Sequence, residues 1–143
     1  MNLDKKDLKI LQMLEQNSEL TSNQISKKTN IPITTIHNRI KKLKQNEIIK
    51  NYTIKINFEK IGKPIKAYIQ ISVNQQKLSQ EEIAEKIKKL ENIESVDIVT
   101  GSTDILIQTR AKTMQDLNNL ITHKLRNIVG IDKTQTMIVL KEI

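Results

Sequence analysis

The stretch of sequence that decides the fold is residues 21–45, TSNQISKKTNIPITTIHNRIKKLKQ. Thr21 and Gln24 have the spacing of a capping box, in which a hydroxyl and an amide side chain satisfy unpaired N–H groups at the start of a helix. Pro32 is tolerated in the first turn of a second helix, because the opening positions of a helix need no N–H donor. The two helices that this pattern predicts, separated by a short turn, cover residues 22–29 and 33–45.

The second of these helices has one apolar face and one polar face. Ile36, Ile40 and Leu43 follow the i, i+4, i+7 spacing of a buried helical stripe. Because successive side chains turn by about 100°, the polar residues fall on the opposite side of the helix. That outward face carries Thr34, Asn38, Lys41 and Gln45, with His37 and Lys42 on its flanks.

Two further elements flank this pair of helices. Residues 4–17 place three leucines on one helical face, with Asp4 as a candidate N-cap. Residues 48–58 alternate apolar and polar side chains and predict a strand. Three helices with a short second turn and a following strand are typical of a winged helix-turn-helix, whose third helix enters the major groove of DNA.

The outward face of the third helix suits double-stranded DNA chemically. Asn38 can pair with N6 and N7 of adenine, while Thr34 and His37 can reach base edges or phosphates. Lys27 and Lys28 lie on the preceding helix, where the DNA backbone should cross. The residues expected to contact DNA are Lys27, Lys28, Ile33, Thr34, Thr35, His37, Asn38, Arg39, Lys41 and Lys42.

The charge distribution favours the same interpretation. The 143-residue chain carries 24 Lys and Arg against 16 Asp and Glu. Residues 1–63 hold 13 basic and 6 acidic side chains, whereas residues 64–143 hold 11 and 10. A basic head on a nearly neutral body is typical of nucleic-acid binding, because neutralising phosphates supplies most of the sequence-independent affinity. A solvated surface in a composition rich in Lys and Ile is the alternative explanation.

The second half of the chain alternates strands and helices. Ser79 and Thr113 are N-cap candidates for its two helices. The order is β-α-β-β-α-β, which is typical of a ferredoxin-like fold with an antiparallel sheet and both helices on one face, so the fold class is α+β. Strands are expected over residues 65–73, 94–100, 104–110 and 131–140.

Gly62 and Pro64 mark the division between the halves, because both residues interrupt regular structure. The expected domains are a winged helix-turn-helix over residues 1–57, a hinge over 58–64 and a ferredoxin-like domain over 65–143.

Composition excludes several classes of site. The chain has no cysteine, which excludes disulfides, cysteine-ligated metals and thiol catalysis. His37 and His123 are the only histidines, and neither has a second ligand at metal spacing. No phosphate-binding loop or nucleophile motif occurs. We therefore expect no metal, no cofactor and no enzymatic activity.

No apolar run approaches the roughly 20 residues of a membrane span, and the first residues lack the apolar core of a signal peptide. We expect a cytoplasmic protein that does not associate with membranes.

The segment from Thr100 to Asp104 forms a tight connection between two expected strands. Asp and Gly are favoured in turns for backbone reasons, so Asp104 can be simple turn chemistry. The other interpretation is an anchor for the ammonium group of a ligand or for a contact between subunits. The residues themselves leave both open.

Several ordered blocks together resemble the leucine-responsive regulatory protein/AsnC group, the feast/famine transcriptional regulators, over almost the whole chain. The matching pieces are Leu3-Asp4 with Ile10-Leu11-x-x-Leu14, Thr35-Ile36-x-x-Arg39-Ile40-Lys41-Lys42-Leu43, Ile48-Ile49-Lys50-x-Tyr52, Ile61-Gly62, Val99-Thr100-Gly101-x-x-Asp104 and Gly130-Ile131-x-x-Thr134-x-Thr136.

The resemblance implies a DNA-binding transcriptional regulator whose residues 65–143 dimerise and bind an effector. Members of this group bind dyad-symmetric promoter sites as homodimers or octamers, and they commonly sense amino acids or related metabolites. By this similarity Asp104 would face the amino group of an effector, with Gly101, Ser102 and Thr103 supplying further contacts.

The sequence departs from the family pattern at several positions, and no particular amino-acid specificity can be carried over. Pro32 replaces a serine N-cap, and Glu19 replaces an arginine. Glu47 and Asn51 replace glycines, and Ser102 and Thr103 replace an aspartate and a tyrosine.

Two other functions fit the same architecture. Siroheme decarboxylases are similar in their two-part organisation, but they would be expected to need histidines, arginines and an aromatic-lined pocket that this chain hardly offers. A ligand-sensing assembly module would use its helical head to contact protein instead of DNA, without the steep salt dependence of phosphate binding.

Overall fold

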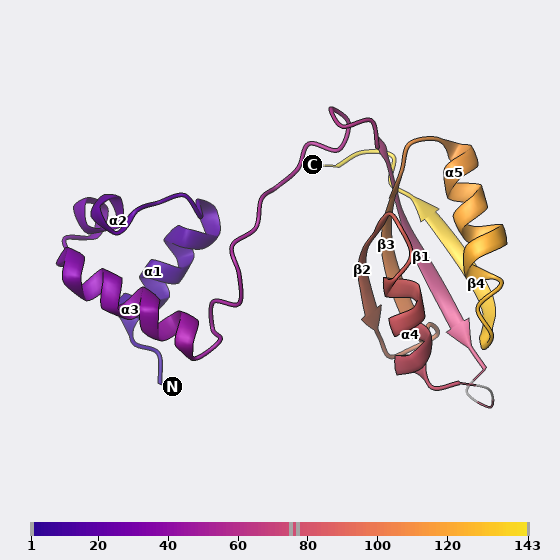
Figure 1. Ribbon diagram of the computed structural model, residues 1–143, viewed down its shortest axis with the longest axis horizontal. Coiled ribbons are helices and arrows are strands. Elements are labelled where there is room, and N and C mark those ends of the chain that lie inside the picture. Colours follow the sequence, from indigo (N-terminus) through magenta and orange to yellow (C-terminus); the bar gives the residue numbers. More distant parts are fainter. Residues whose placement is uncertain (1, 75, 77, 143) are drawn as a thin grey trace. The chain divides into compact units, whose positions relative to one another are not determined.

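The computed structural model describes residues 2–74, 76 and 78–142 (Figure 1). The chain divides into two compact units, Met1–Lys55 and Ile56–Ile143. The first unit contains the three helices that the sequence predicts. These are α1 (Lys5–Gln16), α2 (Ser22–Thr29) and α3 (Ile33–Gln45).

Side-chain caps explain where the first two helices begin. Asp4 and Asp7 form a capping box at the start of α1, and Thr21 and Gln24 form the predicted one at the start of α2. In the latter, Gln24 N donates to Thr21 Oγ1 over 3.2 Å, and Thr21 N donates to Gln24 Oε1 over 2.9 Å. Each box satisfies N–H groups that have no partner inside the helix.

One apolar cluster holds the three helices together. Ile36 and Leu43 are buried on α3 as predicted, and Ile40 is half-buried beside them. Their partners come from α1, α2 and the turn between α2 and α3. These partners are Ile10, Leu14, Ile25 and Ile31.

The chain turns back sharply after the end of α3. Ile48 N and Ile49 N both donate to the carbonyl of Leu43, over 2.9 and 3.1 Å. This return places Glu47 at φ 55°, in the left-handed region that L-residues other than Asn and Asp rarely adopt. Glu47 therefore holds a conformation that glycine would adopt without strain.

The prediction of a strand over residues 48–58 is wrong. Residues 50–57 are extended, but they pair with no other strand in the part of the chain that the structure describes. A strand needs a partner backbone for its N–H and C=O groups, and alternation alone does not supply one. The alternating apolar side chains of this segment are consequently exposed, Ile54 to 79%.

The second unit has the predicted β-α-β-β-α-β order. Its four strands form one antiparallel sheet with the order β2-β3-β1-β4, which confirms the ferredoxin-like fold and the α+β class. The elements are β1 (Ile65–Val73), α4 (Gln80–Lys88), β2 (Ile93–Ile98), β3 (Ile105–Ala111), α5 (Met114–Asn119) with a π-helical continuation (Leu120–Leu125), and β4 (Ile131–Ile138).

The sheet has a buried face and an open face. Ile69 of β1 lies opposite Ile107 of β3 and Thr136 of β4, on the face that α4 and α5 cover (Figure 1). Tyr68, one residue earlier, lies opposite Gln108 and Met137 on the other face. Successive side chains of a strand point to opposite faces, so the apolar alternation of β1 sets which side the helices cover.

The last helix widens part-way along its length. After Asn119 the backbone changes from α- to π-helical geometry, and Arg126 N donates to Ile121 O over 3.3 Å. A π-helix joins residues i and i+5, which brings Leu120 and Leu125 onto the same buried side. The apolar spacing alone predicts a uniform helix here and does not reveal the change.

The residues expected to form the hinge, 58–64, lie in the second unit. Lys63 N donates to Phe58 O over 2.8 Å, which closes a turn, and Phe58 lies 4.4 Å from the guanidinium carbon of Arg110. Lys63 Nζ also donates to Asn92 Oδ1 over 2.7 Å. The division between the two units falls instead between Lys55 and Ile56, within residues 50–57, which have no regular secondary structure.

Gly130→Ala tests how closely β4 approaches α4. Gly130 has φ +99°, and a Cβ there would lie 2.7 Å from Ile83 Cδ1. We expect the substitution to lower the free energy of unfolding by more than about 1 kcal/mol, measured by urea denaturation. Gly62→Ala is the matched control, because Gly62 has φ +77° but open space around the added carbon. Equal losses in both variants would show that the approach to Ile83 contributes nothing.

Candidate DNA-binding and effector sites

The outward face of α3 is exposed along its length. Thr34, His37, Asn38 and Lys41 are exposed, and Ile33 at the first helical position is 47% exposed. Lys42 is also exposed, and Thr35 is half-buried on the flank that it shares with Lys42. The structure therefore brings these predicted residues together on one continuous helical surface.

The start of α3 adds a favourable dipole to this surface. Pro32 makes no side-chain cap, and the first turn contains no acidic residue. The partial positive charge of a helix N-terminus attracts phosphate oxygens. Lys27 and Lys28 are exposed in the last turn of the neighbouring α2. The basic groups and the helix start thus belong to one small helical unit.

Arg39 lies differently from the other predicted DNA contacts. It is on the flank of α3 nearest α1, where its guanidinium forms ion pairs with Asp4 and Asp7. Arg39 is among the residues that the sequence predicts to contact DNA, and its pairing with Asp7, 32 positions away, cannot be predicted from local spacing. The only local signal is the placement of two aspartates three residues apart at the start of α1.

The segment from Thr100 to Asp104 is held by backbone hydrogen bonds. Gly101 has φ +120°, which glycine adopts at no steric cost. Asp104 N donates to Ile71 O over 3.0 Å, and Val99 N donates to Asp104 O over 2.9 Å. The turn is therefore fixed against the end of β1.

Both carboxylate oxygens of Asp104 accept hydrogen bonds from the same unit. Val73 N donates to Oδ2 over 2.8 Å, and Gln80 Nε2 donates to Oδ1 over 2.8 Å. Asp104 thus joins the end of β1 to the start of α4. These bonds favour the structural interpretation of Asp104, although each oxygen keeps a second lone pair for another donor.

Ser102 and Thr103 lie at a different place in the loop. They line a polar hollow on the open face of the sheet, together with β1 and β4 residues. Gly101 and Asp104 do not line this hollow. The remaining lining residues are Gln70, Ser72, Lys133, Thr134 and Gln135.

Comparison with known proteins identifies both units. Residues 66–143 match the family described as the Lrp/AsnC ligand binding domain, and residues 3–50 match a winged helix-turn-helix DNA-binding family. The chain belongs to the Lrp/AsnC family. Its relatives are transcriptional regulators and not enzymes, so the decarboxylase alternative is not supported, and the DNA-binding interpretation of the first unit is confirmed.

Curated relatives of this Lrp/AsnC protein match over nearly their whole length. An uncharacterized HTH-type transcriptional regulator of Pyrococcus furiosus is 37% identical over 137 residues, which cover 95% of this chain and 91% of the relative. The HTH-type transcriptional regulator FL11 of the same organism is 38% identical over 139 residues, covering 97% and 90%.

Solved structures show the same architecture. A transcriptional regulator from Neisseria meningitidis, solved as a complex with L-Met, has a TM-score of 0.93 at 30% identity and is matched over 99% of this chain and 92% of that one. AsnC of E. coli has a TM-score of 0.85 at 25% identity, with 99% and 95% covered.

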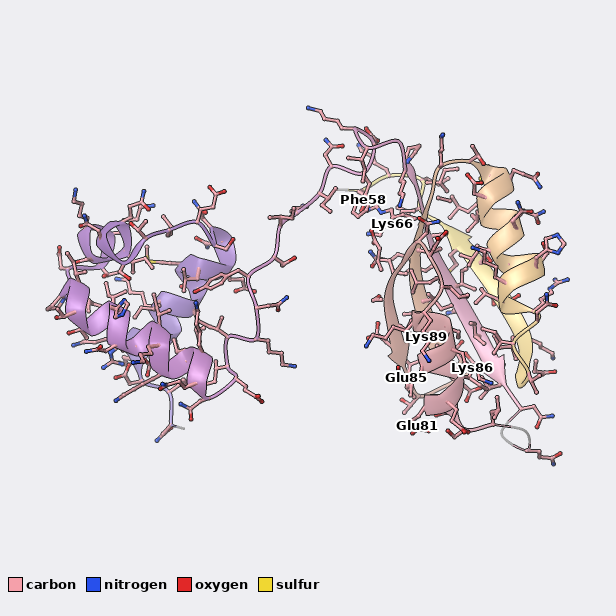
Figure 2. All side chains as sticks on the ribbon, in the orientation of Figure 1. Phe58, Lys66, Glu81, Glu85, Lys86 and Lys89 are labelled. Carbon is pink, nitrogen blue, oxygen red and sulfur yellow. The ribbon has the colours of Figure 1, made fainter. Side chains whose placement is uncertain are left out.

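A charged network lies at one end of the ligand-binding domain of this Lrp/AsnC protein. Glu142 Oε1 accepts from Arg110 Nη2 over 2.9 Å and from Lys66 Nζ over 2.8 Å, and Arg110 Nε pairs with Glu94 over 3.2 Å. Figure 2 labels Phe58 and Lys66 at the same end of the second unit. The network cannot be predicted from local sequence patterns, because its members come from β1, β2, β3 and the segment after β4.

Within the residues that the structure describes, no three His, Cys, Asp or Glu side chains group as metal ligands do. Among the same residues, no helix combines the length and the apolar character needed to cross a membrane.

The Glu142 network predicts a pH dependence. Hydrogen bonds from Arg110 and then Lys66 lower the pKa of Glu142 to about 2, from an ordinary value of 4.5. Because the folded-state pKa is lowered, the stabilisation is complete above pH 4.5 and is lost as the pH falls toward 2. We expect the side-chain carbon shift of Glu142, followed by NMR, to titrate near pH 2, well below the ordinary value of 4.5. A titration of Glu142 near pH 4.5 would contradict the network.

Proposed function

We propose that this Lrp/AsnC regulator reads dyad-symmetric promoter sites as a homo-oligomer through the outward face of α3, and that a small metabolite such as an amino acid modulates it. The observation that carries the proposal is the exposure of Thr34, Asn38 and Lys41 while Ile36 and Leu43 of the same helix are buried. A helix fixed by its apolar side can present its polar side to a groove.

Each candidate contact has a defined role in this proposal. Asn38 pairs with an adenine edge, and Ile33, Thr34, Thr35 and His37 contact bases or phosphates near the start of α3. Lys41 and Lys42 neutralise phosphates, and Lys27 and Lys28 hold the backbone that passes α2. Two such heads related by a dyad read half-sites about 10 base pairs apart, or a multiple of that spacing.

Two features support self-association. The open face of the sheet carries the half-buried Tyr68, Gln70 and Leu106 and the exposed Met137, while both helices lie on the other face (Figure 1). The extended residues 50–57 present unpaired backbone and the 79%-exposed Ile54. A second copy can cover apolar side chains at either place, and exposed apolar groups of this kind mark protein contacts. The proposed assembly is a homodimer or an octamer.

The proposed effector region is the loop formed by Gly101, Ser102, Thr103 and Asp104. Ser102 and Thr103 place hydroxyl groups at the polar hollow, and the carboxylate of Asp104 keeps free lone pairs for an ammonium group. The L-Met complex of the Neisseria meningitidis regulator supports an amino acid as the class of ligand. An effector acts by binding one assembly more tightly than another.

Lys41→Ala tests the electrostatic part of the interface. Removing one phosphate contact should weaken binding to all duplexes similarly and should reduce the slope of log affinity against log salt by about one unit. Fluorescence anisotropy at several salt concentrations measures this slope. Lys112→Ala is the control, because Lys112 is an exposed lysine of the second unit. Identical salt slopes for wild type and Lys41→Ala would show that α3 makes no phosphate contact through Lys41.

Asn38→Ala tests base reading. The substitution should relax the preference at one base position of sites selected from a random library and leave the salt slope unchanged. Gln45→Ala, at the far end of the same exposed face, should leave the selected sequence unchanged. An unaltered base preference with Asn38→Ala would show that this side chain reads no base.

A further inference from the structure

Arg39 is held between two carboxylates of α1. Its Nη1 lies 2.7 Å from Asp4 Oδ2 and 2.8 Å from Asp7 Oδ1. We name Asp4, Arg39 and Asp7 the α1–α3 clamp. A single guanidinium nitrogen makes both ion pairs, so the clamp joins the middle of α3 to the first turn of α1 at one point.

The remaining carboxylate oxygens of the clamp are also engaged. Asp4 Oδ1 accepts from Lys6 N over 2.8 Å and from Asp7 N over 2.9 Å, and Asp7 Oδ2 accepts from Asp4 N over 3.0 Å. Every oxygen of the two aspartates therefore has a partner. The capping box that starts α1 and the ion pairs that hold α3 use the same two side chains.

Burial makes the clamp costly to open. The Asp7 side chain is only 5% exposed and that of Arg39 is 25% exposed, whereas the Asp4 side chain is 53% exposed. A guanidinium that left to contact a phosphate would leave the Asp7 carboxylate buried without its cation, which is strongly unfavourable. The charge of Arg39 is thus already neutralised inside the protein.

The clamp also lies beside the residues that face DNA. Thr35, Asn38 and Lys42 line the same hollow as Asp7 and Arg39. Arg39 is about 100° around α3 from Asn38, on the side between the apolar stripe and the polar face. A tie at this flank adds a directional restraint on the rotation of α3 about its own axis to the restraint that the buried Ile36 and Leu43 already provide.

We propose that Arg39 is a positioning residue for DNA reading: the α1–α3 clamp sets the rotation of α3 and withholds the charge of Arg39 from the phosphate backbone. This inference rests on the proposed function of α3. It changes the role that the sequence suggests for Arg39, from a DNA contact to a support for the residues that make the contacts.

The experiment compares Arg39→Gln, Arg39→Lys and Asp4→Asn in the full chain. Asparagine is as good an N-cap as aspartate, so Asp4→Asn keeps the cap of α1 and removes one ion pair. The control for the lost negative charge is Glu19→Gln, which removes an exposed carboxylate of the same unit. The probes are a duplex selected with the wild-type protein and a scrambled duplex of the same composition, and thermal melts verify folding.

For Arg39→Gln we expect the ratio of affinities for the selected and the scrambled duplex to fall about tenfold, the size of a lost base contact, with an unchanged salt slope. Asp4→Asn should lower the same ratio by a smaller factor, whereas Glu19→Gln should not change it. Arg39→Lys should restore most of the ratio, because one ammonium nitrogen can bridge both carboxylates.

Two results would overturn the proposal. A salt slope reduced by about one unit in Arg39→Gln, as expected for Lys41→Ala, would make Arg39 a phosphate contact. A folded Asp4→Asn variant with an unchanged affinity ratio would show that the clamp does not set the rotation of α3. This conclusion holds even if Arg39→Gln fails to fold. Failure of the proposed function is seen separately, as a Lys41→Ala slope equal to that of wild type.

Discussion

The burial of Ile36 and Leu43 against α1 and α2 is the constraint on which the first unit depends. Each fully buried side chain of this kind contributes about 1.5–3 kcal/mol relative to an exposed one. Since the positions along a helix are fixed at about 100° to one another, burying these two also decides which polar side chains face outward. The surface proposed to contact DNA is the side of α3 that remains exposed once the core has formed.

Most of the fold could be predicted from local patterns in the sequence. The capping boxes at Thr21 and Ser79, the apolar stripe of α3 and the alternation of β1 depend on residues within a few positions of one another, and each leads to the observed element. The first helix is also observed, but its three leucines do not share the buried side, because Leu8 is 55% exposed and Ile10 is buried. The ferredoxin-like order could then be predicted, because few arrangements of four strands and two helices bury all the apolar faces.

The features that the sequence did not reveal depend on partners far along the chain or absent from it. The clamp joins Arg39 to Asp7, 32 residues away, and the Glu142 network joins Glu142 to Arg110, also 32 residues away. The sequence around each of these residues gives no sign of its distant partner. The strand expected at residues 48–58 is not formed, because its alternating pattern suits pairing but no strand among the described residues pairs with it.

The candidate sites divide in the same way. Residues of the α3 face could be found from periodicity alone, because exposure on a helix follows from spacing. The role of Asp104 could not, since a carboxylate after a glycine turn looks the same whether it waits for a ligand or holds its own chain. The bonds from Val73 and Gln80 show that Asp104 holds its own chain, and they leave lone pairs for the proposed ligand.

Those two bonds have a mechanical consequence. Asp104 is a single joint between the last residue of a central strand and the first residue of a helix, so a cation that drew its carboxylate away would release both ends at once. Binding at this loop would then loosen the end of β1 and the start of α4 together. A change confined to this turn would be transmitted directly to both elements.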